Sequence, residues 1–305
     1  MKRLQNRIAE SGLLLPVMAV YGLGVWLLGG LLTRQWWPQL ACFVLSAYLM
    51  VELTNVNALL RVRSRMVSAT FIALSCTMCF LFGSLTGGLL QLFVIASLLL
   101  LLSTYQMPQA LERVFYAFVL IGLASIFFVQ ILFFVPLLWL LMATQLQALS
   151  WRTWLASVLG ILTPYWFLML WFLYQQDFSP LVAHVATLTH IQVPHFTFQA
   201  GPVMAFAFTL VLAAAGIVHF WQYSFEDKIR IRLLFGFFTA MTVFTLFLAI
   251  VQPQHFGVLL RLSFVVVSPL VAHLFTFTSS RLSNMLFFAA LAVALAITVF
   301  NLISC

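Results

Sequence analysis

Arg261 lies inside an apolar run long enough to cross a membrane, "GVLLRLSFVVVSPLVAHL". A charge at membrane depth is costly, so it needs either a ligand or a route to the interface. The planar guanidinium binds a phosphate or pyrophosphate through two parallel hydrogen bonds. His255 stands at the mouth of the run, and Ser268, seven residues after Arg261, shares its helical face. We therefore expect these three residues to bind an anionic lipid headgroup. The alternative is an arginine that merely extends to the outer phosphates.

A second candidate site lies in the polar segment 176–201. It contains four ionisable side chains: Asp177, His184, His190 and His195. One of them could act as a general acid or base beside a phosphate held by Arg261. The histidines are six and five residues apart, which does not place them on one helix face and disfavours zinc. We predict no metal and no cofactor here. Anchoring of the segment at the membrane interface is the alternative to catalysis.

Other reactive groups favour structural roles. Glu52 ends the second apolar run and precedes a basic segment, so a surface ion pair with Arg61, Arg63 or Arg65 is the simplest expectation, with a coupling proton as the alternative. The "CTMC" segment lies at membrane depth without a second pair of ligands, which favours small buried side chains over metal or redox chemistry.

The elements that position these residues follow from composition. The chain has 305 residues, of which 64% are hydrophobic and 7% charged, and a mean hydropathy of +1.13. Such a balance is typical of a membrane protein, and no polar stretch is long enough for a separate soluble domain. We expect one integral-membrane domain over 1–305. The net charge of +8 reflects topology rather than nucleic-acid binding, because cytoplasmic loops collect Lys and Arg.

Apolar runs of about 20 residues predict an all-α polytopic protein with about eleven transmembrane helices. The long run after Val114 is divided near Gln130, with Pro136 as an expected kink just beyond. The expected spans are 12–33, 37–53, 67–84, 88–104, 114–129, 131–148, 154–175, 202–221, 233–251, 257–278 and 284–303.

Charge places the N-terminus in the cytoplasm and Cys305 outside. With that orientation, twelve of the fourteen Lys and Arg residues face the cytoplasm, and only Arg34 and Arg261 do not. Segment 176–201 then lies outside, half buried along the interface. The expected location is a bacterial inner membrane, with membrane lipids as the first partners.

Three segments carry a resemblance: "NVNALLRVRSRMVSATF", "SWRTWLASVLGILTPYWF" and "QHFGVLLRLSFVVVSPLVAHLF". Together they resemble a family of polytopic inner-membrane proteins of about this length from Bacteroidota. The resemblance covers most of the chain and implies a shared multi-pass topology, without an activity to carry over.

The segment "HFGVLLRLSFVVVSPLVAHL" also resembles, more distantly, the last part of GT-C superfamily membrane glycosyltransferases, which use polyprenyl-phosphate sugars. This resemblance implies that Arg261 holds the phosphate of such a lipid. Those enzymes carry an acidic residue in the first external loop, whereas "TRQWWPQ" has none. That departure puts metal-dependent sugar transfer in doubt.

These observations predict a protein that binds or handles a lipid-linked substrate of the polyprenyl-phosphate type in cell-envelope or glycan assembly. The enzymatic version is a GT-C-like transferase. The alternatives are a non-catalytic structural subunit with protein partners in an envelope complex, and a transporter of a lipid or small molecule. Nucleotide-binding and hydrolase motifs are absent from the sequence, which disfavours an ATP-driven pump or a protease.

Overall fold

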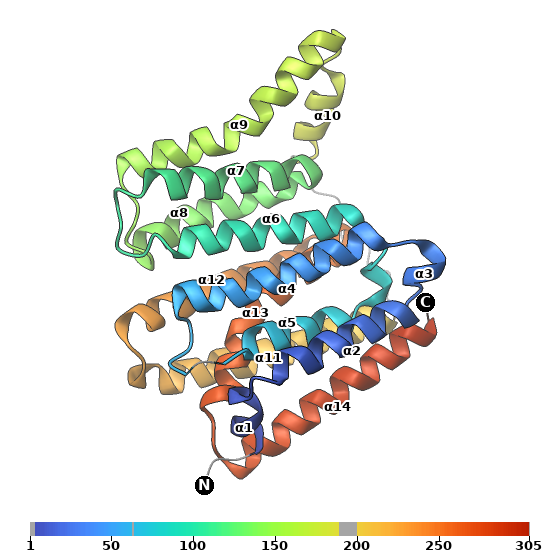
Figure 1. Cartoon of the computed structure of the whole chain (residues 1–305). Helices are drawn as coiled ribbons and strands as arrows, with labels where there is room; N and C mark the ends of the chain where they lie inside the picture. The colour runs from blue at the N-terminus through green and yellow to red at the C-terminus, as the bar shows by residue number, and fades with distance from the viewer. Residues whose placement is uncertain (1–3, 63, 189–199, 305) are drawn as a thin grey trace. The chain divides into compact units, whose positions relative to one another are not determined.

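The computed structural model describes residues 4–62, 64–188 and 200–304. These residues form fourteen α-helices and four short 3-10 helices, without a strand among them, so the expected all-α fold class is confirmed. The helices pack as two compact units (Figure 1). The expectation of a single domain over 1–305 stays a prediction.

Unit 1 comprises residues 1–88 and 195–305. Its helices are α1 (Leu4–Glu10), α2 (Leu14–Leu28), α3 (Leu31–Arg34), α4 (Trp37–Asn57), α5 (Met66–Cys76), η1 (Cys79–Leu81), the first turn of α6 (Leu85–Leu102), α11 (Ala200–Tyr223), η3 (Ser224–Glu226), α12 (Ile229–Val251), η4 (Pro253–His255), α13 (Phe256–Phe277) and α14 (Arg281–Ser304).

Helix α13 forms the core of unit 1. It is apolar on almost every side, so it is buried all round, and it packs against α5, α11, α12 and α1. Pro269 lies within it and removes one backbone hydrogen bond. The Thr70 hydroxyl oxygen of α5 lies 3.2 Å from the neighbouring Ser268 carbonyl oxygen. The helix that carries Arg261 is therefore held rigidly by its neighbours.

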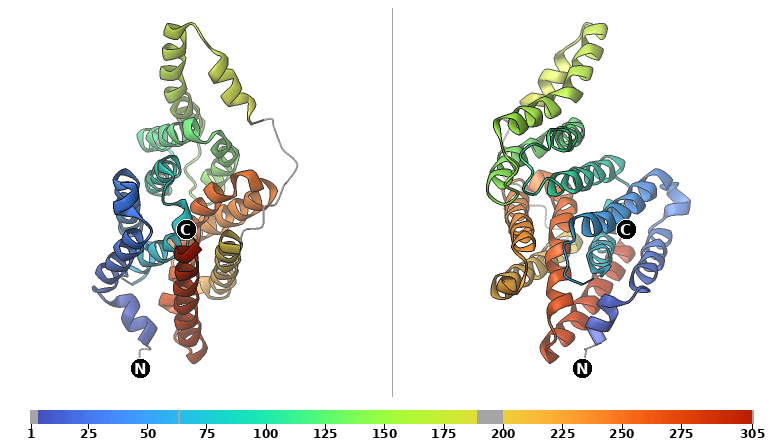
Figure 2. Two further views of the ribbon diagram at one scale, coloured as in Figure 1. Left: turned by 90° about the vertical axis from the view of Figure 1, so that its right-hand side faces the viewer. Right: turned by 60° about the vertical axis from the view of Figure 1, so that its left-hand side comes forward.

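Unit 2 comprises residues 89–194. Its helices are the rest of α6, α7 (Leu111–Phe127), η2 (Val129–Phe133), α8 (Phe134–Thr144), α9 (Trp151–Gln175) and α10 (Ser179–Ala186). Helices α7 and α9 approach closely through two glycines. A Cβ at Gly160 would lie 2.6 Å from the Phe115 carbonyl oxygen, and one at Gly122 would lie 2.8 Å from that of Ile161. The second half of α9 continues past α7 with exposed aromatic side chains, and α10 folds back beside it (Figure 2).

Seven helices in the described part of the chain are long and apolar enough to cross a membrane. The bent pair α1 and α2, which meet at 87°, would make an eighth. The protein is thus a multi-pass helical membrane protein. Each of the eleven expected spans overlaps a helix, but four coincide only with shorter ones: α2, α5, α7 and α8. The count of eleven stays a prediction.

The division near Gln130 is confirmed, because α7 ends at Phe127 and the 3-10 helix η2 follows. Pro136 lies in the first turn of α8, where the backbone N–H has no partner within that helix to lose. The expected kink at this proline stays a prediction.

The basic loops of unit 1 meet at one end, here called the basic end. The Ser64 hydroxyl donates to the Ala9 carbonyl at 2.5 Å, and the Asn6 amide donates to the Thr276 carbonyl at 2.9 Å. The described basic residues of these loops are Arg7, Arg61, Arg65, Lys228, Arg230, Arg232 and Arg281. Lys2, Arg3, Arg63 and Cys305 lie outside the described residues.

The opposite end of unit 1, here called the Arg261 end, is tied together separately. The Asn301 amide donates to the Thr77 carbonyl at 2.7 Å, and the Gln39 amide donates to the Gly83 carbonyl at 3.3 Å. Arg34 lies at this end, with its guanidinium 5.0 Å from the centre of the Trp36 ring. The two arginines that charge counting set apart from the rest are therefore found away from the basic end.

Candidate functional site

Arg261 lies in the second turn of α13, at the end of unit 1 opposite the basic end. Its Nη2 donates to the carbonyl oxygen of Leu81, beside the break that ends α5. Among the described residues, no carboxylate pairs with it. The guanidinium has five N–H donors, so one carbonyl leaves most of them without an acceptor. A largely desolvated cation in this condition favours an anion.

The first turn of α6 packs against this guanidinium. The Ser84 hydroxyl caps the helix by accepting from the Gly87 N–H at 3.1 Å. A Cβ at Gly87 would lie 3.2 Å from Cζ of Arg261, which is closer than an ordinary contact, so the absence of a side chain there allows the guanidinium its present position. The positive end of the helix dipole thus adds to the charge of Arg261. Two positive groups this close favour a bound anion.

The other two residues of this predicted site differ in their placement. His255 belongs to η4, directly before α13, and lies at the Arg261 end as expected. Ser268 is fully buried in the contact between α5 and α13, and its hydroxyl donates to the Phe264 carbonyl at 2.5 Å. Helical periodicity placed Ser268 on the right face, but it lies about 10 Å further along the helix than Arg261. Its hydroxyl is occupied by the backbone, and its role in binding stays a prediction.

Asp177 and His184 lie together in unit 2. Asp177 caps α10 by accepting from the backbone N–H of Ser179 at 2.9 Å and from the hydroxyl of the same residue. These hydrogen bonds lower the pKa of Asp177 below its ordinary value. His184 donates through Nε2 to the Ser125 carbonyl at 3.0 Å, which ties α10 to α7.

Both contacts are structural, and a catalytic role for either side chain stays a prediction. His190 and His195 lie outside the described residues. Within the described part, no group of three or more His, Cys, Asp and Glu side chains could hold a metal ion.

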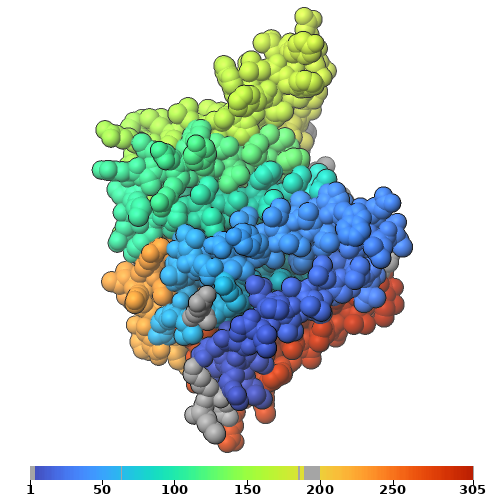
Figure 3. Space-filling view, viewed as in Figure 1, coloured from blue at the N-terminus to red at the C-terminus, as the bar shows by residue number. Residues whose placement is uncertain are grey.

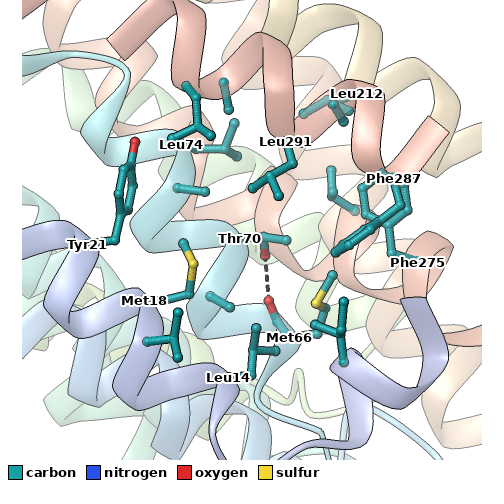
Figure 4. A pocket seen from close by; sticks show the side chains of 18 of the residues that line it. Leu14, Met18, Tyr21, Met66, Thr70, Leu74, Leu212, Phe275, Phe287 and Leu291 are labelled. Carbon is teal, nitrogen blue, oxygen red and sulfur yellow. Dashed lines mark hydrogen bonds between the residues drawn. The ribbon is translucent and has the colours of Figure 1, made fainter. Parts of the chain in front are cut away.

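An apolar crevice of about 320 Å³ lies between α1, α2, α5, α11, α13 and α14 of unit 1. Figure 4 shows side chains from these helices around it, among them Met18, Leu74, Leu291 and Phe287. Its two hydroxyls are already bonded: Thr70 donates to the Met66 carbonyl at 2.9 Å, and Tyr21 pairs with Thr298 at 3.0 Å. The wall therefore offers apolar contact only.

A buried charged cluster at the basic end was not predicted. The Asp227 carboxylate is completely shielded from solvent. One of its oxygens lies 2.8 Å from Nε of Arg61, and the other lies 2.9 Å from Nε2 of His273. Nδ1 of His273 faces Nδ1 of His219 at 3.4 Å. Arg61 also binds Glu226, through its carbonyl at 3.1 Å and its carboxylate at 3.4 Å.

The carboxylate fixes the protons of this cluster. Because the carboxylate only accepts, His273 donates to it through Nε2, and in the neutral ring its Nδ1 is the acceptor for the Nδ1–H of His219. The guanidinium of Arg61 also lies 4.6 Å from the centre of the Phe277 ring. The cluster thus joins the loop after α4, the turn between α11 and α12, and the end of α13.

The sequence contained two signals for this cluster. "FEDKIRIR" holds the only adjacent acidic residues in the chain, and the expected topology placed His219 and His273 at the same membrane face as Arg61. Glu52 was expected to pair with Arg61, Arg63 or Arg65. Arg61 instead binds acids 165 and 166 positions downstream, and Arg65 binds Asn55. Arg63 lies outside the described residues, so a pair with it stays a prediction. The partners of Arg61 were missed because the acids of the α11–α12 turn come within reach only after folding.

Three kinds of comparison with known proteins were made, and no family model, curated protein or solved structure matches the chain. The resemblances to the Bacteroidota family and to the GT-C superfamily accordingly stay predictions.

Proposed function

We propose that this multi-pass membrane protein binds an anionic, lipid-linked substrate at the Arg261 end of unit 1. The observation that carries the proposal is the environment of Arg261. In the described chain, its guanidinium meets one carbonyl and no carboxylate, and it lies against the first turn of α6. An anion supplied by a ligand would complete this arrangement, because phosphate oxygens match the guanidinium fork.

The substrate class is a polyprenyl phosphate or a glycan linked to one, used in cell-envelope assembly. A phosphate anchored by an apolar chain can enter sideways from the leaflet, and a cation about one turn inside the membrane surface is placed to meet it. Transfer of a sugar and simple binding share this first step. The enzymatic version adds Asp177 or a histidine of segment 176–201 as the base.

The topology that we propose has eleven crossings, with a cytoplasmic N-terminus and an external C-terminus, in a bacterial inner membrane. The clustering of the described basic loops at one end of unit 1 supports this orientation. Labelling of single cysteines introduced beside Arg34 and beside Lys228 tests it. Only the first should react with an impermeant reagent added to intact cells.

Native mass spectrometry tests the binding proposal. Wild type and Arg261→Gln would be extracted in mild detergent and supplied with polyprenyl phosphate and bulk phospholipid. We expect an adduct of polyprenyl mass on wild type that is weakened roughly 30-fold or more in the variant, as when one partner of a desolvated charge pair is removed.

Arg34→Gln is the matched control, because Arg34 lies at the same end but stacks on Trp36. It should keep the adduct. Equal retention by Arg261→Gln, or wild type that carries only bulk phospholipid, would contradict the proposal. Either result would make Arg261 an interfacial anchor and favour the structural-subunit alternative.

A further inference from the structure

The apolar crevice in unit 1 has properties that the Arg261 site does not explain. A buried water needs two to four polar partners, whereas the hydroxyls of Thr70 and Tyr21 are already bonded. The crevice therefore favours an apolar occupant. Its volume of about 320 Å³ is roughly twice that of a cavity of ~150 Å³ known to hold benzene.

The crevice has the length of one leaflet. Its wall on α5 runs from Met66 to Leu74, and its wall on α14 runs from Phe287 to Leu295. Eight residues of helix span about 12 Å. This is less than half of the ~30 Å hydrocarbon core of a bilayer. A chain that enters from one leaflet fits this depth.

The rim of the crevice is basic. Ile8 and Met66 line it, and the residues directly before them are Arg7 and Arg65. Arg281 opens α14, and the turn around it is bonded to α1 through Gln5, whose backbone N–H donates to Asn284 at 3.2 Å. Arg7 and Arg281 are exposed, and neither has a carboxylate partner in the residues that the structure describes.

Helix α1 closes this end. It meets α2 at 87°, so it lies across the helices that span the membrane while contributing Ile8 to the wall. Helices α2 and α14 run side by side along one face of unit 1 (Figure 3), where Tyr21 pairs with Thr298. An apolar crevice flanked by two such helices, with a cationic rim, matches a lipid with an anionic headgroup.

We infer that the crevice binds one acyl chain of an anionic glycerophospholipid from the leaflet at the basic end, with the headgroup held at Arg7, Arg65 and Arg281. This site is separate from the proposed substrate site, because the crevice reaches α13 only at Val271 and Phe275. Val271 lies ten residues, or about 15 Å, from Arg261.

Native mass spectrometry with phosphatidylglycerol and phosphatidylcholine of identical chains tests the inference. Ala73→Phe projects an aromatic ring into the crevice from α5 and should weaken retention of phosphatidylglycerol roughly tenfold or more, since the ring obstructs the path of the chain. Ala292→Phe, on the exposed side of α14, is the matched control and should bind as wild type does. Equal loss in both variants, or loss in neither, would overturn the inference.

The headgroup is tested with the double variant Arg7→Gln/Arg281→Gln. It should lose about fivefold of the preference for phosphatidylglycerol over phosphatidylcholine per arginine removed. Arg152→Gln, in unit 2, is the control and should keep the preference. A wild type without any preference would contradict an anionic headgroup. Arg261→Gln should leave this binding unchanged, so failure here and failure of the proposed function are distinguishable.

A crosslinking measurement needs no variant. Wild type would be placed in phosphatidylcholine vesicles with a small fraction of phosphatidylglycerol that bears a photoreactive group midway along one chain. Adducts should concentrate in residues 66–74 and 287–295. An even spread over all lipid-facing helices would show that the crevice is empty of chains.

Discussion

The arginines at the two ends of unit 1 have opposite electrostatic environments. At the basic end, Arg61 reaches two carboxylates and the face of Phe277, and the buried Asp227 is shared with His273. At the other end, Arg261 meets a single carbonyl and the backbone of α6. One cation is neutralised within the fold, while the other has no internal counter-charge among the described residues.

This difference separates structural from functional charge. A charge pair with low exposure stabilises the fold only while both partners are present, and its loss leaves an uncompensated ion. A desolvated cation without a partner costs stability instead, and such a cost is typical of a binding site. The comparison therefore predicts opposite effects of mutation at the two ends.

The largest effect is expected from Asp227→Asn. The variant removes the fully shielded carboxylate that Arg61 and His273 share, so the free energy of unfolding should fall by about 2–3 kcal/mol. Thermal unfolding in detergent measures it. Glu226→Gln is the control: its carboxylate is 48% exposed, and a change of at most ~0.5 kcal/mol is expected. Similar losses of unfolding free energy in both variants would show that the buried cluster makes no special contribution to stability.

The comparison is sharpest between Arg61→Met and Arg261→Met. Loss of Arg61, whose side chain is 30% exposed, should lower stability by about 1–2 kcal/mol, because Asp227 keeps only His273. Loss of Arg261 should leave stability unchanged or raise it by up to ~1 kcal/mol in the absence of ligand. Unfolding curves of the two purified variants check the signs. A loss of stability with Arg261→Met would place Arg261 among the structural charges.

Gly87→Ala tests the Arg261 end without changing its charge. The new Cβ would lie 3.2 Å from Cζ of Arg261 and 3.0 Å from the Ser84 hydroxyl, so the guanidinium must shift. Affinity for polyprenyl phosphate should fall about threefold to tenfold, since a displaced fork loses one of two hydrogen bonds. Gly24→Ala, where a Cβ meets nothing within 4 Å, is the control for added helix propensity. Unchanged binding by Gly87→Ala would show that the first turn of α6 does not contribute to the binding site.

The sequence predicted the helices better than their contacts. Apolar runs located α4, α6 and α11 to α14 to within a few residues, because burial in a membrane demands long unbroken runs. It missed that α5 ends at Cys76, since the residues that follow are equally apolar and carry no turn signal. The break matters, because it exposes the Leu81 carbonyl that Arg261 binds.

The sequence identified only the part of the candidate site that a single residue reveals by its type. Arg261 was identified because a charge in an apolar run is conspicuous. Gly87 and Ser84 carried no comparable signal, since their value depends on α6 approaching α13 in space. Asp227 was missed for the same reason: an acid in a basic loop resembles an ordinary surface residue until folding brings His273 to it.

Asp177 gives the smallest expected effect, as a fully exposed acid in unit 2 that contrasts with the buried Asp227. Hydrogen bonds from Ser179 lower its pKa in the folded state, so the stabilisation of α10 is present above the ordinary Asp value of about 3.9. It is lost as the pH falls through the lowered pKa.

Hydrogen exchange at α10 should therefore be constant from pH 7 to about pH 5 once corrected for intrinsic rate. Asp177→Asn should accelerate it slightly across that range, whereas Glu112→Gln, on α7, should leave it unchanged. Protection that disappears between pH 7 and 5 in wild type would mean that a group other than Asp177 holds α10 in place.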